Sequence, residues 1–77
     1  MSVLSNGKGR TVVKSKQYNY VAVDTCYTFD RGWETMVFPC DKNGNILSWL
    51  DLDAMVYSSR QEAAKGHVEM VNKWRVN

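Results

Sequence analysis

The stretch that decides the fold reads SSRQEAAKGHVEMVNKW, from Ser58 to Trp74. Ser59 and Glu62 have the spacing of a capping box, in which two side chains satisfy backbone N–H groups that a helix leaves unpaired at its start. Apolar residues then recur at helical spacing and form one stripe, which Ala63 and Met70 widen: Ala64, His67, Val68, Val71 and Trp74. We therefore expect a helix from about Arg60 to about Trp74.

Gly66 lies in the middle of this predicted helix, where glycine costs about 1 kcal/mol relative to alanine. A close approach of the helix backbone to a sheet would explain such a residue. The sequence before residue 58 supplies the sheet, because apolar and polar side chains alternate there as in β-strands. In the strongest stretch, residues 18–29, we expect the face with Val21, Val23 and Tyr27 to point to the core.

Shorter runs and turn signals complete the predicted sheet. Thr11-Val12-Val13 indicates an edge strand, and residues 33–40 form a second strong strand. Asn43-Gly44 predicts a tight turn, after which residues 46–50 are expected to return as another strand. Pro39 has no N–H to donate, so we expect it to end the pairing or to lie at an edge.

These elements predict an α+β fold, with three or four antiparallel strands in meander order and one C-terminal helix packed on one face. Residues 1–9 are expected to be a flexible basic arm, and residues 10–77 a single domain. Because so short a chain buries only a modest core, association into a homo-oligomer is a further expectation.

The formal net charge is only +2, so the chain as a whole has no strong attraction to nucleic acid. The cations are unevenly placed, because four precede the first acidic residue: Lys8, Arg10, Lys14 and Lys16. One interpretation is a solvated arm or an edge strand kept soluble by lysine. The other is an arm that binds phosphate through residues such as Lys8 and Arg10.

No catalytic or metal-binding motif stands out. Cys26, Cys40 and His67 do not have the spacing of metal ligands, and we expect free thiols and a structural histidine. We therefore predict no cofactor, no metal site and no enzyme activity. No apolar run is long enough to span a bilayer and the first residues lack the pattern of a signal peptide, so a cytoplasmic location is expected.

Two groups of residues are typical of binding surfaces. Arg31-Gly32-Trp33 places a forked cation and a large aromatic ring side by side at a turn, and both side chains are common anchors at interfaces. Tyr18 and Tyr20 share the strand face that we do not assign to the core, where they would form an aromatic patch. The alternative for Trp33 is simple packing into the core.

Two segments also carry a resemblance. The strand that contains ETMVFP, the turn DKNGN and the helix pattern GHxxMVxxW are similar to small uncharacterised proteins of phages and prophages of Gram-positive bacteria. The resemblance covers roughly residues 20–75 and brings no catalytic residue with it. It implies a phage accessory protein that acts in the cytoplasm of a bacterial host.

From these features we expect a non-enzymatic protein that binds and inhibits a host protein, plausibly of a defence system. Its binding residues would be Arg31 and Trp33, followed by Tyr18 and Tyr20. A first alternative is an oligomeric sponge for a nucleotide signalling molecule, with a pocket of arginine and aromatic rings. A second alternative is nucleic-acid binding through the basic N-terminal arm.

Overall fold

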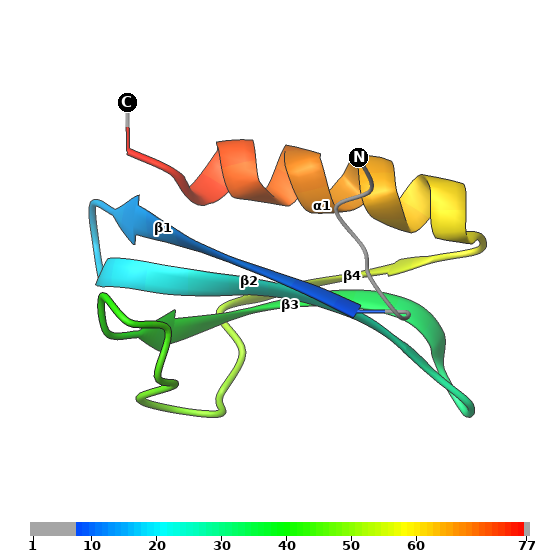
Figure 1. Ribbon diagram of the computed structural model, residues 1–77, viewed down its shortest axis with the longest axis horizontal. Helices are drawn as coiled ribbons and strands as arrows, with labels where there is room; N and C mark the ends of the chain where they lie inside the picture. Colours follow the sequence, from blue (N-terminus) through cyan, green and yellow to red (C-terminus); the bar gives the residue numbers. More distant parts are fainter. Residues whose placement is uncertain (1–7, 77) are drawn as a thin grey trace.

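The computed structural model describes residues 8–76 and shows one antiparallel sheet with one helix across one of its faces (Figure 1). The elements in chain order are β1 (Lys8–Ser15), β2 (Asn19–Thr28), β3 (Gly32–Cys40), β4 (Asp53–Tyr57) and α1 (Arg60–Trp74). The sheet order is β1-β2-β3-β4, which is a meander. The predicted α+β fold and the predicted helix bounds are both confirmed. Of the predicted arm, residues 8 and 9 belong to β1, and residues 1–7 lie outside the described part.

Two short turns set the register of the first three strands. Gly32 has φ +77°, a conformation that glycine adopts without the steric cost borne by other residues, and it lets β3 pair directly back onto β2. The resulting ladder places Val23 opposite Val37 and Tyr27 opposite Trp33. On its other edge β2 pairs with β1, with Val21 opposite Val13.

The core lies between the sheet and α1. Its buried cluster consists of Val13, Val21, Val23, Val37 and Met70, with Leu52, Val71 and Trp74 packed against it. Val21 and Val23 therefore confirm the predicted core face, but Tyr27 does not, because its side chain is 54% exposed. Toward its tip the β2–β3 hairpin bends away from α1 (Figure 1).

The buried stripe of α1 differs slightly from the predicted one. Ala63, Gly66, His67 and Met70 are buried, whereas Val68 is 45% exposed, so its assignment to the stripe was wrong. The close approach predicted at Gly66 is confirmed, because a Cβ atom there would overlap the ring of Tyr57. The helix thus packs with its backbone against a side chain of β4.

The start of α1 is capped as the sequence predicts, with one change of partner. The Ser59 hydroxyl accepts the N–H of Glu62 at 3.1 Å. The Glu62 carboxylate bonds to the residue before the cap, accepting the Ser58 hydroxyl at 2.7 Å and its N–H at 3.2 Å. These contacts lower the pKa of Glu62 from its ordinary value.

One prediction fails between β3 and β4, where residues 46–50 do not form a strand. Pairing does begin after the turn, with a bridge between Cys40 and Ile46 and a bond from the Leu47 N–H to the Pro39 carbonyl at 2.9 Å. Pro39 cannot donate the matching bond, so the pairing stops there. It resumes when the Leu52 N–H reaches the Val37 carbonyl at 2.7 Å.

The interruption leaves four residues outside the sheet. The first register pairs Cys40 with Ile46, and its continuation would place Trp49 opposite Val37. Asp53 stands opposite Val37 instead, so the register has shifted by four residues. We call residues 48–51 the excursion. On the opposite edge of β3, Pro39 still pairs with Val21, so it ends the pairing on one side only.

Candidate interaction surface

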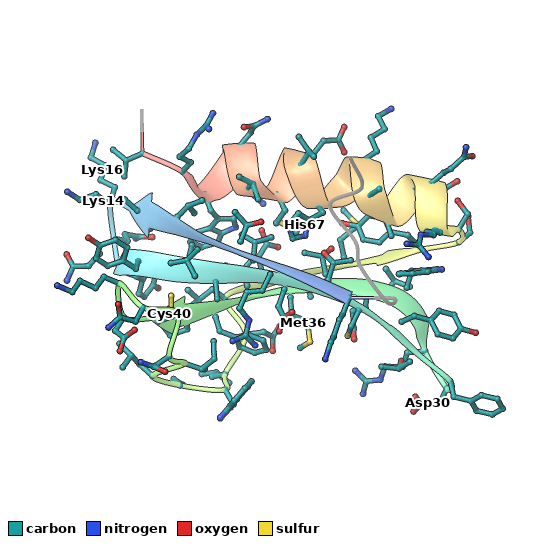
Figure 2. The ribbon with its side chains drawn as sticks, viewed as in Figure 1. Lys14, Lys16, Asp30, Met36, Cys40 and His67 are labelled. Carbon is teal, nitrogen blue, oxygen red and sulfur yellow. The ribbon has the colours of Figure 1, made fainter. Side chains whose placement is uncertain are left out.

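The groups able to do chemistry lie apart from one another. His67 lies between α1 and the sheet, while Cys40 lies on the opposite face (Figure 2). Both cysteines are free thiols, and burial is the largest cause of the raised pKa of Cys26 and of Cys40, so neither is activated as a thiolate. Within residues 8–76, no group of three or more histidine, cysteine or acidic side chains could hold a metal ion.

His67 is fully engaged in packing. Its Nδ1 lies 2.6 Å from the Thr25 hydroxyl and its Nε2 lies 2.8 Å from the Thr11 hydroxyl, and the side chain is 1% exposed. The Thr25 hydroxyl also bonds to Thr35. Burial lowers the pKa of His67, and the weaker effect of nearby Asp24 opposes this shift. A neutral ring with both nitrogens satisfied holds the helix to the sheet, as expected of a structural histidine.

The predicted binding residues Arg31 and Trp33 lie at the tip of the β2–β3 hairpin. Arg31 is exposed and lies 3.6 Å from the carboxylate of Glu34. The Trp33 ring is partly buried, with Tyr27 edge-on at 5.3 Å between centroids and the Arg60 guanidinium 5.9 Å from its centre. Trp33 is therefore neither a core residue nor a free platform.

Tyr18 and Tyr20 lie at the opposite end of the sheet, near the β1–β2 turn. Both line a groove of about 490 Å³ together with Lys14, Asn19, Cys40, Asp41, Lys42 and Leu47. Tyr18 also packs against Trp74 at the end of α1, with ring centroids 6.3 Å apart. The structure thus brings these two tyrosines together but separates them from Arg31 and Trp33.

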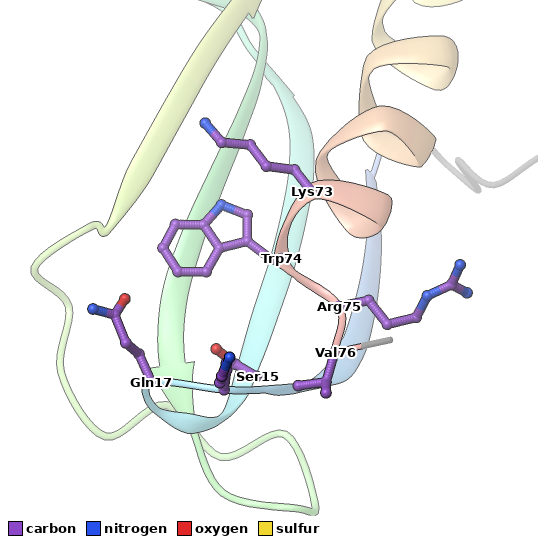
Figure 3. A pocket seen from close by; sticks show the side chains of 7 residues that line it. Ser15, Gln17, Lys73, Trp74, Arg75 and Val76 are labelled. Carbon is purple, nitrogen blue, oxygen red and sulfur yellow. The ribbon is translucent and has the colours of Figure 1, made fainter.

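A second groove of about 780 Å³ lies between the β1–β2 turn and the end of α1 (Figure 3). Its lining residues are Ser15, Lys16, Gln17, Lys73, Trp74, Arg75 and Val76. Trp74 donates its indole N–H to Asp53 at 3.0 Å, and Lys73 forms an ion pair with the same carboxylate at 2.8 Å. Two of the side chains that line this groove, Lys73 and Trp74, are therefore held in place by Asp53.

Cations dominate this end of the molecule. Lys14 and Lys16 project there, and Lys42 and Arg75 are also exposed (Figure 2). The acidic groups nearby are engaged. Asp41 accepts the side-chain amide of Asn45 and backbone N–H groups of its own turn, which lowers its pKa. Asp53 binds Lys73. We call this surface the basic-aromatic end; its members are Lys14, Lys16, Tyr18, Tyr20, Lys42 and Arg75.

The other predicted basic residues lie on β1. Lys8 is exposed at the start of the strand, opposite Cys26. Arg10 bonds to Asp24 at 2.8 Å and to the Gly44 carbonyl at 3.3 Å. Arg10 therefore ties the turn after β3 to the sheet, and its charge is balanced by Asp24.

Three exposed apolar side chains that lie close together in the chain were not singled out from the sequence. Leu47 is 67% exposed, Trp49 70% and Leu50 77%, all in the loop that leaves β3 at Pro39. The Trp49 ring meets Phe38 edge-on at 5.2 Å, which folds the excursion against the sheet face that α1 does not cover. Pro39 could have indicated this loop, because it lies seven residues after the start of β3 and shortly before the turn at Asn43-Gly44.

Comparison with known proteins finds no family model, no curated protein and no solved structure that matches this chain. Among residues 8–76 the single long helix, α1, is too short and too polar to cross a bilayer.

Proposed function

We propose that this protein is a non-catalytic binding protein whose partner is an acidic surface of another protein. The observation that carries the proposal is the exposure of Leu47, Trp49 and Leu50 in one loop, beside the basic-aromatic end. A cluster of large apolar side chains left in water favours burial against a partner. Leu47 belongs to both surfaces, since it also lines the groove with Tyr18 and Tyr20.

The composition of this surface favours a protein partner over nucleic acid. Single-stranded nucleic acid binds to flat rings that are free for stacking, but Tyr18 is packed on Trp74. Leucine side chains gain little from bases or phosphates and much from apolar protein surface. The lysines then form a charged rim that steers an acidic partner and makes the association rate sensitive to salt.

The identity of the partner rests on the sequence. The similarity of the ETMVFP strand and the GHxxMVxxW helix to phage and prophage proteins supports a partner in the bacterial host, and inhibition of a host defence protein is the role we propose. Arg31 and Trp33 lie at the other end of the sheet and are not part of this surface. Binding there would be a separate event.

The test is affinity capture from a bacterial host extract with matched variants. Leu50→Ser and Lys42→Glu change exposed side chains, so both variants should fold like the parent yet lose the captured protein. Val68→Ser is the control, because Val68 is an exposed apolar residue on α1. A protein retained by Val68→Ser, lost by the other two variants and released at high salt supports the proposal.

Three outcomes would overturn it. Capture of the same proteins by Leu50→Ser and by the parent would show that the loop is not the binding surface. Material that disappears after nuclease treatment would indicate nucleic acid, and heat released on titration with cyclic nucleotides would indicate a nucleotide sponge. The groove in Figure 3, with Lys16, Arg75 and Trp74, is where such a nucleotide would be sought.

A further inference from the structure

The two edges of the sheet differ in how they are protected. The β1 edge carries Lys8, Arg10 and Lys14 on one face, and such charges discourage a second sheet from pairing there. The β4 edge, Asp53–Tyr57, carries neither lysine nor proline, and its Met55 and Val56 side chains are 53% and 61% exposed. An edge of this kind is open to the addition of another strand.

The backbone direction of β4 follows from its pairing. Val37 and Pro39 accept bonds on the edge of β3 that faces β4, so alternate residues of β3, among them Thr35 and Trp33, direct their backbone groups to that edge. The register partners of Val37, Thr35 and Trp33 in β4 therefore point their backbone groups toward β3; they are Asp53, Met55 and Tyr57. Ala54 and Val56 consequently point their N–H and C=O groups outward. The N–H of Ala54 donates to the adjacent Asp53 carboxylate at 2.9 Å, an exposed contact that another acceptor can replace.

We infer that β4 is a homodimerisation edge, where β4 pairs antiparallel with β4 of a second copy about a twofold axis at Met55. In this register Ala54 stands opposite Val56 of the other copy, and the outward groups of the two residues form reciprocal bonds. Met55 meets its own symmetry mate in the intervening pair that lacks hydrogen bonds. The two sheets then become one continuous eight-stranded sheet.

The side chains are compatible with this register. No like charges stand opposite one another, because Asp53 faces Tyr57 and the large Val56 faces the small Ala54. On the helix face, Met55 floors a groove of about 230 Å³ beside Met70 and Tyr57, and the twofold axis joins the two grooves into one. The same operation on β1 about Val12 would oppose Arg10 and Lys14, which repel.

The contact is small, since one five-residue strand and its groove are covered. Stable interfaces usually bury at least about 1,000 Å² in total, so we expect a dimer whose population rises with protein concentration. Sedimentation equilibrium should give a mass that moves from 8.8 kDa toward twice that value. Met55→Lys should hold the protein at the monomer mass, because it sets two cations face to face, whereas Val68→Lys should not.

Cysteine scanning tests the register itself, in a Cys26→Ser background. Paired residues without hydrogen bonds have Cα atoms about 4.5 Å apart, within the range that a disulfide spans. Met55→Cys should therefore cross-link to its own mate under mild oxidation. Val56→Cys, one residue away and similarly exposed, should not, because its mate is Ala54 and the nearest equivalent cysteine lies diagonally, beyond about 7 Å.

Three results would overturn this inference. They are a monomer mass at millimolar concentration, equal cross-linking of Met55→Cys and Val56→Cys, or a dimer that persists in Met55→Lys. None of them tests binding by the loop of Leu47 to Leu50, which precedes β4 in the chain and takes no part in the β4 pairing. A dimer that captures no host protein would contradict the proposed function alone.

Discussion

Gly66 determines how closely α1 can approach β4. Its Cα faces the ring of Tyr57, and a methyl group there would overlap three atoms of that ring. Alanine favours a helix by about 1 kcal/mol over glycine, but in Gly66→Ala the ring must leave its site. We expect Gly66→Ala to lower the free energy of unfolding by about 1–2 kcal/mol, measured by urea denaturation.

A double mutant separates the two effects. In a Tyr57→Ala background the overlap is gone, so Gly66→Ala should instead raise the free energy of unfolding by about 1 kcal/mol. An equal loss in both backgrounds would mean that Tyr57 is not the obstacle. The residue therefore acts through a single contact rather than through its own flexibility.

At the scale of elements, the start of α1 depends on one hydroxyl. The Ser59 hydroxyl accepts the N–H of Glu62, a group in the first helical turn that has no backbone partner within the helix. Ser59→Ala should cost about 1 kcal/mol of unfolding free energy. Ser58→Ala, which removes a side-chain bond outside the helix, should cost less, and a larger loss in Ser58→Ala would refute this assignment.

The elements show what a sequence can and cannot specify. The helix, the three long strands and their order were predictable, because each has a clear period and a clear turn signal. The path after Pro39 was not, since Ile46 to Leu50 has the composition of a strand and even begins to pair. What decides against the strand is a missing donor on the facing strand, and this depends on which side of β3 the chain returns.

The candidate site illustrates the same limit. Tyr18 and Tyr20 were correctly singled out as neighbours, but the alternation of strand residues could not show that Tyr18 also packs on Trp74. Asn19, with φ +65°, breaks the alternation between them. The pairing of Arg10 with Asp24 was likewise invisible, because it depends on the register of β1 against β2.

At the scale of the whole molecule, acid should weaken the fold through its single histidine. Burial lowers the pKa of His67 below its ordinary value of 6.5. As the pH falls past 6.5, the unfolded chain binds a proton that the folded protein does not, so the free energy of unfolding decreases. The slope from one proton is at most about 1.4 kcal/mol per pH unit, and the contribution of this group to stability is constant above that range.

The effect of His67 can be measured separately, because the carboxyl groups with shifted pKa values titrate at lower pH. Asp41, Asp53 and Glu62 have lowered pKa values, and their ordinary values are 3.8, 3.8 and 4.5. Between pH 6.5 and 4.5 the slope should therefore belong mainly to His67. Denaturation curves across this range should slope for the parent and stay nearly flat for His67→Gln. The same slope in both would assign the effect elsewhere.

Backbone hydrogen bonds to β3 flank the four residues of the excursion on both sides. The Leu47 N–H bonds to the Pro39 carbonyl before them, and the Leu52 N–H bonds to the Val37 carbonyl after them. These four residues can therefore be replaced without altering the backbone pairing on either side of them. Randomising Ser48 to Asp51 would turn this chain into a miniature display scaffold, on which new specificities could be selected as they are on antibody loops.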